Sequence, residues 1–162
     1  MHGSHIAVRR VSHQDLGRVF EIEASSFAEP FPFSFFERML EISPRAFLIA
    51  VHNGEPAGYV VASVEGKAGH ILSIAVDPGK RRMGIGAALM TELSRELEAM
   101  GMSWLSLEVK RSNLAARAFY GRMGFGETGI LEGYYGGHED GVAMSRKIGV
   151  TEITNGVRLN PR

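Results

Sequence analysis

The stretch that decides the fold is Ile74-Ala75-Val76-Asp77-Pro78-Gly79-Lys80-Arg81-Arg82-Met83-Gly84-Ile85-Gly86-Ala87. Its first residues are typical of a β-strand, and apolar residues recur at helical spacing after the two glycines. The amide N–H groups of a helix's first turn have no partner inside the helix, and the helix dipole adds positive potential there. The stretch therefore predicts a strand, an anion-binding loop and a helix, an arrangement that suits a phosphate group.

Two glycines separated by one residue are weak evidence on their own, because glycines also allow a helix to pack closely on a strand. A Walker loop requires Gly-Lys-Ser/Thr after four intervening residues, and Ser or Thr beside the lysine is missing here. A dinucleotide-binding loop lies near the first strand, whereas this loop follows the fourth predicted strand. The chemistry of the loop therefore depends on the residues around it.

On the N-terminal side of the loop, the pattern predicts a strand, a helix up to about Ser25, a second short helix before Pro44 and a meander of three antiparallel strands. Ser12 and Asp15 have the spacing of a capping box, and Asn53-Gly54 is a strong hairpin-turn signal. Gly66 and Gly69 mark a second turn. The predicted strands cover residues 6–11, 46–51, 57–64 and 70–76.

On the C-terminal side, the pattern predicts a helix that ends at Gly101 and a second helix that is capped by Ser112 or Asn113 and ends at Gly124. The predicted strands are 104–110, 125–130 and 141–147, with a glycine-rich loop up to Asp140. Because a helix joins strand 70–76 to strand 104–110, these two strands should be parallel neighbours connected by a right-handed crossover.

The composition indicates one globular domain over residues 1–148 and a polar tail over 149–162 that is typical of disorder. The chain has 162 residues, 44% of them hydrophobic, zero formal net charge and no cysteine. Disulfides, thiolate metal sites and a cysteine nucleophile are thereby excluded. We expect a cytoplasmic protein with no membrane span and no direct nucleic-acid binding. Residues 1–5 resemble an expression remnant and are left out of the fold prediction.

Arg81-x-x-Gly84-x-Gly86-Ala87 resembles the acetyl-CoA signature of the GNAT acetyltransferases. Further elements resemble the RimI and Ard1 type of N-terminal acetyltransferase, namely Leu107-Glu108-Val109-Lys110, Ser112-Asn113, Ala118-Phe119-Tyr120 and Gly124-Phe125. The similarity spans residues 6–147. The fold that it implies is α/β, with about seven strands in a mixed sheet, about four flanking helices and splayed central parallel strands.

The resemblance also implies acetyl-CoA as co-substrate and no metal. Backbone amides from Arg82 to Ala87 would hold the pyrophosphate, Ile74 to Val76 would pair with the pantetheine, and Asn113 would bond to the pantetheine. Asn113 is equally a good helix cap by itself. The implied cofactor residues are Ile74, Ala75, Val76, Arg81, Arg82, Met83, Gly84, Ile85, Gly86, Ala87, Asn113 and Tyr120.

Acetyl transfer requires a base for the amine proton and a proton donor for the departing thiolate. On strand 104–110, the alternation of side chains directs Glu108 away from the apolar face. A single strand glutamate in such a position is usually just a solvated residue. The resemblance implies instead that Glu108 is the general base, acting through an ordered water. The resemblance also implies that Tyr120 is the general acid. The alternative is that the Tyr120 ring only packs in the core. His70 could lie near Glu108, as a second base, a water holder or a structural residue.

The acceptor would be bound by two aromatic loops, one around Phe27, Glu29 and Phe31 and the other containing Tyr134 and Tyr135. The first loop is similar to both Ard1-type and RimI-type sequences, so the subfamily stays open. The alternative for the phenylalanines is closure of a hydrophobic surface, which suits Phe35 and Phe36, two expected core residues.

We therefore predict transfer of an acetyl group from acetyl-CoA to a protein N-terminal α-amine, by direct attack in a ternary complex. The acceptor could be a ribosomal protein or nascent chains in general, and an auxiliary subunit could assist a monomer or weak dimer. Acetylation of lysine or a small amine, a non-catalytic acetyl-CoA-binding subunit and a nucleotide-binding protein are the alternatives.

Overall fold

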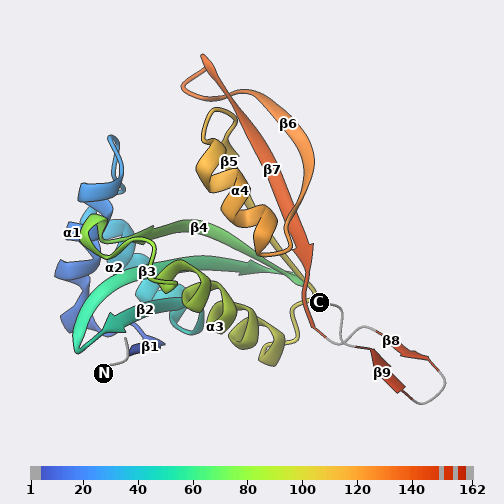
Figure 1. The fold of residues 1–162 in the computed structure, drawn as a ribbon, viewed down its shortest axis with the longest axis horizontal. Coiled ribbons are helices and arrows are strands. Elements are labelled where there is room, and N and C mark those ends of the chain that lie inside the picture. The colour runs from blue at the N-terminus through green and yellow to red at the C-terminus, as the bar shows by residue number, and fades with distance from the viewer. Residues whose placement is uncertain (1–4, 150–151, 155–156, 160–162) are drawn as a thin grey trace. The chain divides into compact units, whose positions relative to one another are not determined.

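The structure is a computed structural model that describes residues 5–149, 152–154 and 157–159. Seven strands form one mixed sheet in the order β1-β2-β3-β4-β5-β7-β6, and four α-helices are present in the described residues (Figure 1). The strands of this sheet are β1 (Ile6–Arg10), β2 (Phe47–His52), β3 (Glu55–Glu65), β4 (Ala68–Val76), β5 (Trp104–Lys110), β6 (Gly126–Tyr135) and β7 (Glu139–Lys147). The helices are α1 (Leu16–Ser26), α2 (Phe33–Ile42), α3 (Ile85–Ala99) and α4 (Leu114–Arg122). This architecture confirms the predicted fold class.

The chain divides into two compact units. One contains Met1–Ser63 and Leu72–Glu96, and the other contains Val64–Ile71 and Leu97–Arg162. In the predicted tail, β8 (Glu152–Thr154) pairs with β9 (Val157–Leu159), and the other tail residues beyond Gly149 lie outside the described residues. The predicted division into a domain over 1–148 and a tail stays a prediction.

In the first unit, β2 pairs antiparallel with β3, as the Asn53-Gly54 turn predicts, and β1 pairs antiparallel with the other edge of β2. Asn53 and Gly54 both have positive φ, 50° and 84°, which is the geometry of a type I′ hairpin turn. Asp15 ends the 3-10 turn His13–Asp15 (η1) and accepts the Ser12 N–H at 2.8 Å, so the predicted capping residues meet. The core beneath α1 and α2 is aromatic and aliphatic, and its largest members include Ile22, Phe36, Phe47, Ile49 and Tyr59.

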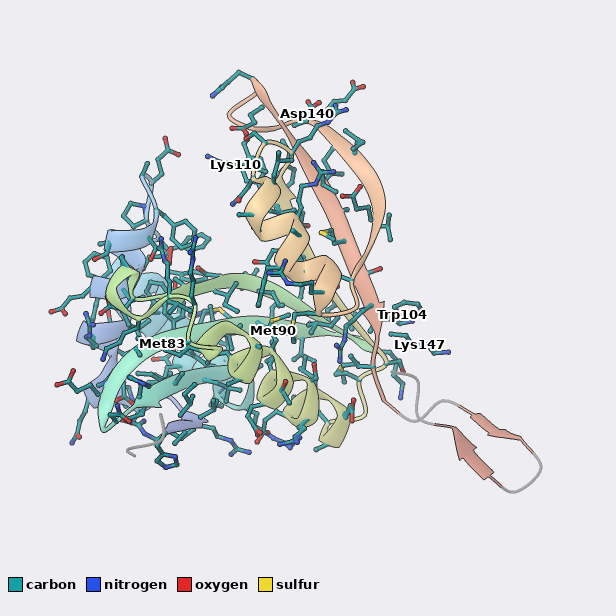
Figure 2. The ribbon with its side chains drawn as sticks, viewed as in Figure 1. Met83, Met90, Trp104, Lys110, Asp140 and Lys147 are labelled. Carbon is teal, nitrogen blue, oxygen red and sulfur yellow. The ribbon has the colours of Figure 1, made fainter. Side chains whose placement is uncertain are left out.

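In the second unit, β4 pairs with β5 in parallel from Ala68↔Trp104 to His70↔Ser106, as predicted. The described ladder ends there although both strands continue. Strand β7 pairs antiparallel with the whole length of β5, from Trp104↔Lys147 to Lys110↔Gly141. Figure 2 accordingly shows Lys110 and Asp140 at one end of these strands and Trp104 and Lys147 at the other.

Two local predictions are corrected by the second unit. Gly69 lies inside β4 and not in a turn. Close packing accounts for the glycine, since a Cβ there would lie 2.6 Å from a Leu97 methyl group. The glycine-rich segment after Ile130 is mostly strand, since β6 continues to Tyr135 and only the turn 136–138 separates it from β7. Glycine lowers the strand propensity of that segment, but its two ends pair with β7 at Leu131↔Gly141 and Tyr135↔Glu139, with a register shift between them.

Candidate functional site

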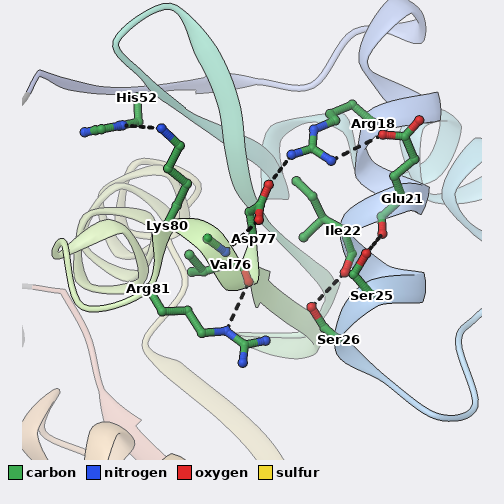
Figure 3. A network of polar contacts seen from close by, with 11 residues as sticks. Arg18, Glu21, Ile22, Ser25, Ser26, His52, Val76, Asp77, Lys80 and Arg81 are labelled. Carbon is green, nitrogen blue, oxygen red and sulfur yellow. Dashed lines mark hydrogen bonds and ion pairs between the residues drawn. The ribbon is translucent and has the colours of Figure 1, made fainter.

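The loop between β4 and α3 is held by Asp77. One carboxylate oxygen of Asp77 accepts the Gly79 N–H at 2.9 Å and caps the 3-10 turn Pro78–Lys80 (η3), while the other pairs with the Arg18 guanidinium of α1 (Figure 3). The Gly79 N–H and the Arg18 charge lower the pKa of Asp77. The carboxylate therefore stays ionised at neutral pH and fixes the start of the loop.

The loop itself exposes unpaired backbone donors. Arg82 and Gly84 have positive φ, 66° and 82°, which turns successive peptide groups toward one side. The helix bonds begin with the Ala88 N–H to the Gly84 carbonyl at 3.0 Å. Within the described residues, no intramolecular acceptor is found for the amides of residues 82–87. These free donors at a helix N-terminus fit the pyrophosphate expected from the sequence.

The strand before this loop supplies the residues expected to meet the pantetheine. Ala75 is buried, while Ile74 and Val76 are half-buried. The described pairing of β4 with β5 stops at His70, so the backbone of 74–76 has no described strand partner on that edge. An unpaired strand edge can accept an extended ligand as an added strand.

The second unit brings together the predicted base and His70. Glu108 Oε2 lies 2.6 Å from His70 Nε2, and His70 Nδ1 lies 2.7 Å from the Ser106 hydroxyl. Both members of the pair keep part of their side chains exposed, 33% for His70 and 24% for Glu108. Parallel pairing of β4 with β5 produces this contact, because it aligns His70 with Ser106, two residues before Glu108.

Ser106 was not among the predicted site residues. Its hydroxyl can donate to an unprotonated Nδ1 or accept from a protonated one, so it can serve His70 in either charge state. The alternation of β5 already places Ser106 on the Glu108 face, and this signal could have identified it. The three side chains can take up and hold one proton.

The Tyr134 and Tyr135 phenols interact with the Glu108 carboxylate, and a third phenol, Tyr120, interacts with Tyr135. Burial raises the pKa of Tyr120 to about 12, with the Tyr135 phenol adding to the effect. Burial first, then the charges of Tyr134, Glu108 and Glu139, raise the pKa of Tyr135 to about 12. The pKa of Tyr134 is raised by burial and by Glu108. All three are therefore protonated hydrogen-bond donors at neutral pH.

Tyr134 and Tyr135 are positioned by the end of the β6–β7 hairpin. Their rings pack edge to face at 5.0 Å, and the Lys110 ammonium lies 5.6 Å from the Tyr135 ring centre. Asp140 accepts the Gly133 N–H at 3.0 Å and pairs with Arg111 at 3.2 Å. The hairpin end is thus tied to the segment after β5.

Asn113 caps helix α4, which is one of the two roles predicted for it. Its side-chain oxygen accepts the Ala116 N–H at 3.1 Å at the start of α4. The side-chain amide N–H₂ group remains a donor for a ligand. Tyr120 lies two turns further along α4, between the Phe119 and Phe125 rings at 5.4 and 5.9 Å.

The phenylalanine loop belongs to the first unit. Phe27 and Phe31 are exposed by 42% and 39%, and Phe31 stacks on Phe35 at 4.2 Å. Glu29 between them is exposed. Phe36 is fully buried and Phe35 partly buried, as expected of core residues. An aromatic loop that is partly open to solvent can contact a peptide.

Among the described residues, no group of three or more His, Asp or Glu is placed to hold a metal ion. None of the helices in the described part of the chain is long and apolar enough to cross a membrane.

Comparison with known proteins places these residues in context. Residues 16–125 match the acetyltransferase (GNAT) family. An uncharacterized N-acetyltransferase of Methanocaldococcus jannaschii is 36% identical, with 86% of this chain and 90% of that protein covered. The [ribosomal protein bS18]-alanine N-acetyltransferase of Escherichia coli is 35% identical, with 83% and 92% covered. The crystal structure of Ard1 from Thermoplasma volcanium superposes with a TM-score of 0.83 at 29% identity, covering 88% and 97%.

Proposed function

The chain belongs to the acetyltransferase (GNAT) family, and from this premise we propose that it acetylates the N-terminal α-amine of proteins with acetyl-CoA as donor. One observation carries the proposal, the Glu108 carboxylate joined to His70 at 2.6 Å with both groups still open to solvent. The names of two similar proteins, the alanine N-acetyltransferase and Ard1, support an α-amine as acceptor.

The free amides of residues 82–87 would hold the pyrophosphate of acetyl-CoA, with Arg81 beside them, and the open edge of 74–76 would hold the pantetheine. The co-substrate supplies the thioester whose acetyl group is transferred. Asn113 would donate its side-chain amide to the pantetheine. Helix N-terminal amides are suited to this because they bind negative charge without a cationic side chain.

Glu108 and His70 would remove a proton from the acceptor ammonium, directly or through a water, so that the neutral amine can attack the thioester carbonyl. The C–N bond forms as the C–S bond breaks. Tyr120 would give its phenol proton to the departing thiolate. No acyl-enzyme is required, and the absence of cysteine from the chain is in keeping with that.

Tyr134 and Tyr135 would hydrogen-bond the acceptor backbone, while Phe27, Glu29 and Phe31 would contact its first residues. Ribosomal or nascent chains are the proposed acceptors, with or without an auxiliary subunit, and the protein would act in the cytoplasm as a monomer or weak dimer.

Acceptor specificity tests this proposal. The protein would be incubated with acetyl-CoA and matched peptides that carry a free N-terminus, a blocked N-terminus, or a blocked N-terminus with an internal lysine. We expect transfer to the free α-amine only, located by mass spectrometry. Transfer confined to lysine side chains would refute the proposed acceptor, and no transfer to any peptide would refute the enzyme activity on proteins.

A further inference from the structure

A buried carboxylate in the first unit has no part in this mechanism. Glu23 of α1 is only 2% exposed, and no Lys or Arg among the described residues pairs with it. One of its oxygens, Oε2, accepts the hydroxyl of Tyr59 from β3 and the hydroxyl of Ser73 from β4, the latter at 3.0 Å. Burying a carboxylate without a cation costs free energy, so these neutral donors are what hold the charge in the core.

The other oxygen of Glu23 reaches the phenylalanine loop. Oε1 accepts the Phe31 N–H at 3.3 Å, and the Glu23 main-chain carbonyl accepts the Phe27 N–H at 3.1 Å. Pro30 and Pro32 have no N–H group. Among residues 28–32, the Phe31 N–H is the one donor with a described intramolecular acceptor.

We propose that Glu23 is a positioning residue that holds loop 27–32, from inside the core, in the conformation that binds the acceptor peptide. This inference rests on the proposed function. The Glu23 side chain bonds the loop backbone at Phe31, directly beyond the point where the last backbone bond of α1 ends the helix at Phe27. Through Tyr59 and Ser73, the same carboxylate is fixed to two strands of the sheet, which gives the loop a rigid support.

Fixing the loop before the peptide arrives should favour binding, because the peptide does not then have to order the loop. Loss of the tether should therefore raise the KM for the acceptor peptide. It should leave kcat and the KM for acetyl-CoA near their wild-type values, because Glu23 contacts neither the loop 81–87 nor Glu108.

The test variant is Glu23→Met, which keeps most of the side-chain volume but removes both acceptors. The Tyr59 and Ser73 hydroxyls lie 2.8 Å apart and can bond to each other once the carboxylate is gone. Removing a buried carboxylate that has no cationic partner also removes the free-energy cost of burying it, so the protein should remain folded. Glu23→Gln is the second variant, should Glu23→Met not fold, and it should act in the same direction more weakly.

The control is Ser43→Ala. The Ser43 hydroxyl is also buried and donates to the Ala62 carbonyl at 2.7 Å, away from the loop. Its loss should lower stability without changing the peptide KM. A melting curve for each variant separates a general loss of stability from release of the loop.

Two measurements decide the proposal. Hydrogen exchange of the Phe31 amide should become at least about tenfold faster in Glu23→Met, the expected effect of losing a bond to a charged acceptor, and the peptide KM should rise about as much. Unchanged exchange, or faster exchange with an unchanged peptide KM, overturns the proposal, as does an equal rise in both KM values. No transfer by the wild-type protein would instead mark failure of the proposed function.

Discussion

Replacing Tyr120 by phenylalanine tests the assignment of the proton donor most directly. The ring would keep its packing between Phe119 and Phe125, so only the hydroxyl is lost. Burial raises the pKa of this phenol from 10.0 to about 12, which makes it about a hundredfold weaker acid. At pH 8, roughly one molecule in 10⁴ would be ionised, so the donor is intact throughout the usual assay range.

Loss of a positioned general acid typically lowers the rate by about 10² to 10⁴. We expect Tyr120→Phe to lower kcat within that range and to change the peptide KM by less than about twofold. Steady-state acetylation of a free N-terminal peptide would be followed through the thiol that is released, from pH 6 to pH 10. A melting curve would confirm that the variant is folded.

The sign of the pH effect follows from the raised pKa. A donor with a pKa of about 12 loses its proton only above the assay range, so Tyr120 should cause no fall in rate below pH 10. Tyr135→Phe is the matched control, since that phenol also has a pKa of about 12, and its loss should raise the peptide KM instead. A Tyr120→Phe variant with kcat within about twofold of wild type would refute the assignment. A fall in the wild-type rate below pH 10 that is absent from the Tyr120→Phe variant would also refute the assignment.

Three further predictions concern the base, a capping carboxylate and one glycine. Glu108→Gln should lower kcat by about 10² or more at pH 7, and unchanged turnover would show that the mechanism is wrong. Asp15→Asn should lower the free energy of unfolding by up to about 2 kcal/mol at pH 7, because Arg9 above all depresses the Asp15 pKa from 3.8 to about 2. That stability is complete above about pH 4 and is lost as the pH falls through 2, so urea unfolding at pH 2 should hardly distinguish the two proteins. Gly69→Ala should cost about 1 to 3 kcal/mol through overpacking against Leu97, whereas Gly129→Ala, with open space around it, should not.

Local signals in the sequence predicted the elements where the decisive interactions are local. Asn53-Gly54 adopts the positive φ angles that its turn requires, Asn113 caps α4, and the helix after Gly84 begins at Ile85. Each of these depends on hydrogen bonds or backbone preferences within about four residues. Such features can be identified without knowing the rest of the fold.

Pairing between strands decided the features that were predicted less well. The length of β6 and the position of Gly69 inside β4 depend on neighbours that come from elsewhere in the chain. The contact of His70 with Glu108 was foreseen because a helical crossover makes the two strands parallel neighbours. The register that brings the two side chains to 2.6 Å is a property of the folded sheet.

The sequence by itself determined the order of the elements, the glycine loop with its free amides, and the presence of Glu108 and Tyr120 at family spacing. The role of Glu23 was decided only by the tertiary structure. Glu23 lies on the buried face of α1, but its partners Tyr59 and Ser73 lie 36 and 50 residues away. A buried carboxylate is stable only where folding brings donors to it, and no local pattern in the sequence records which donors those are.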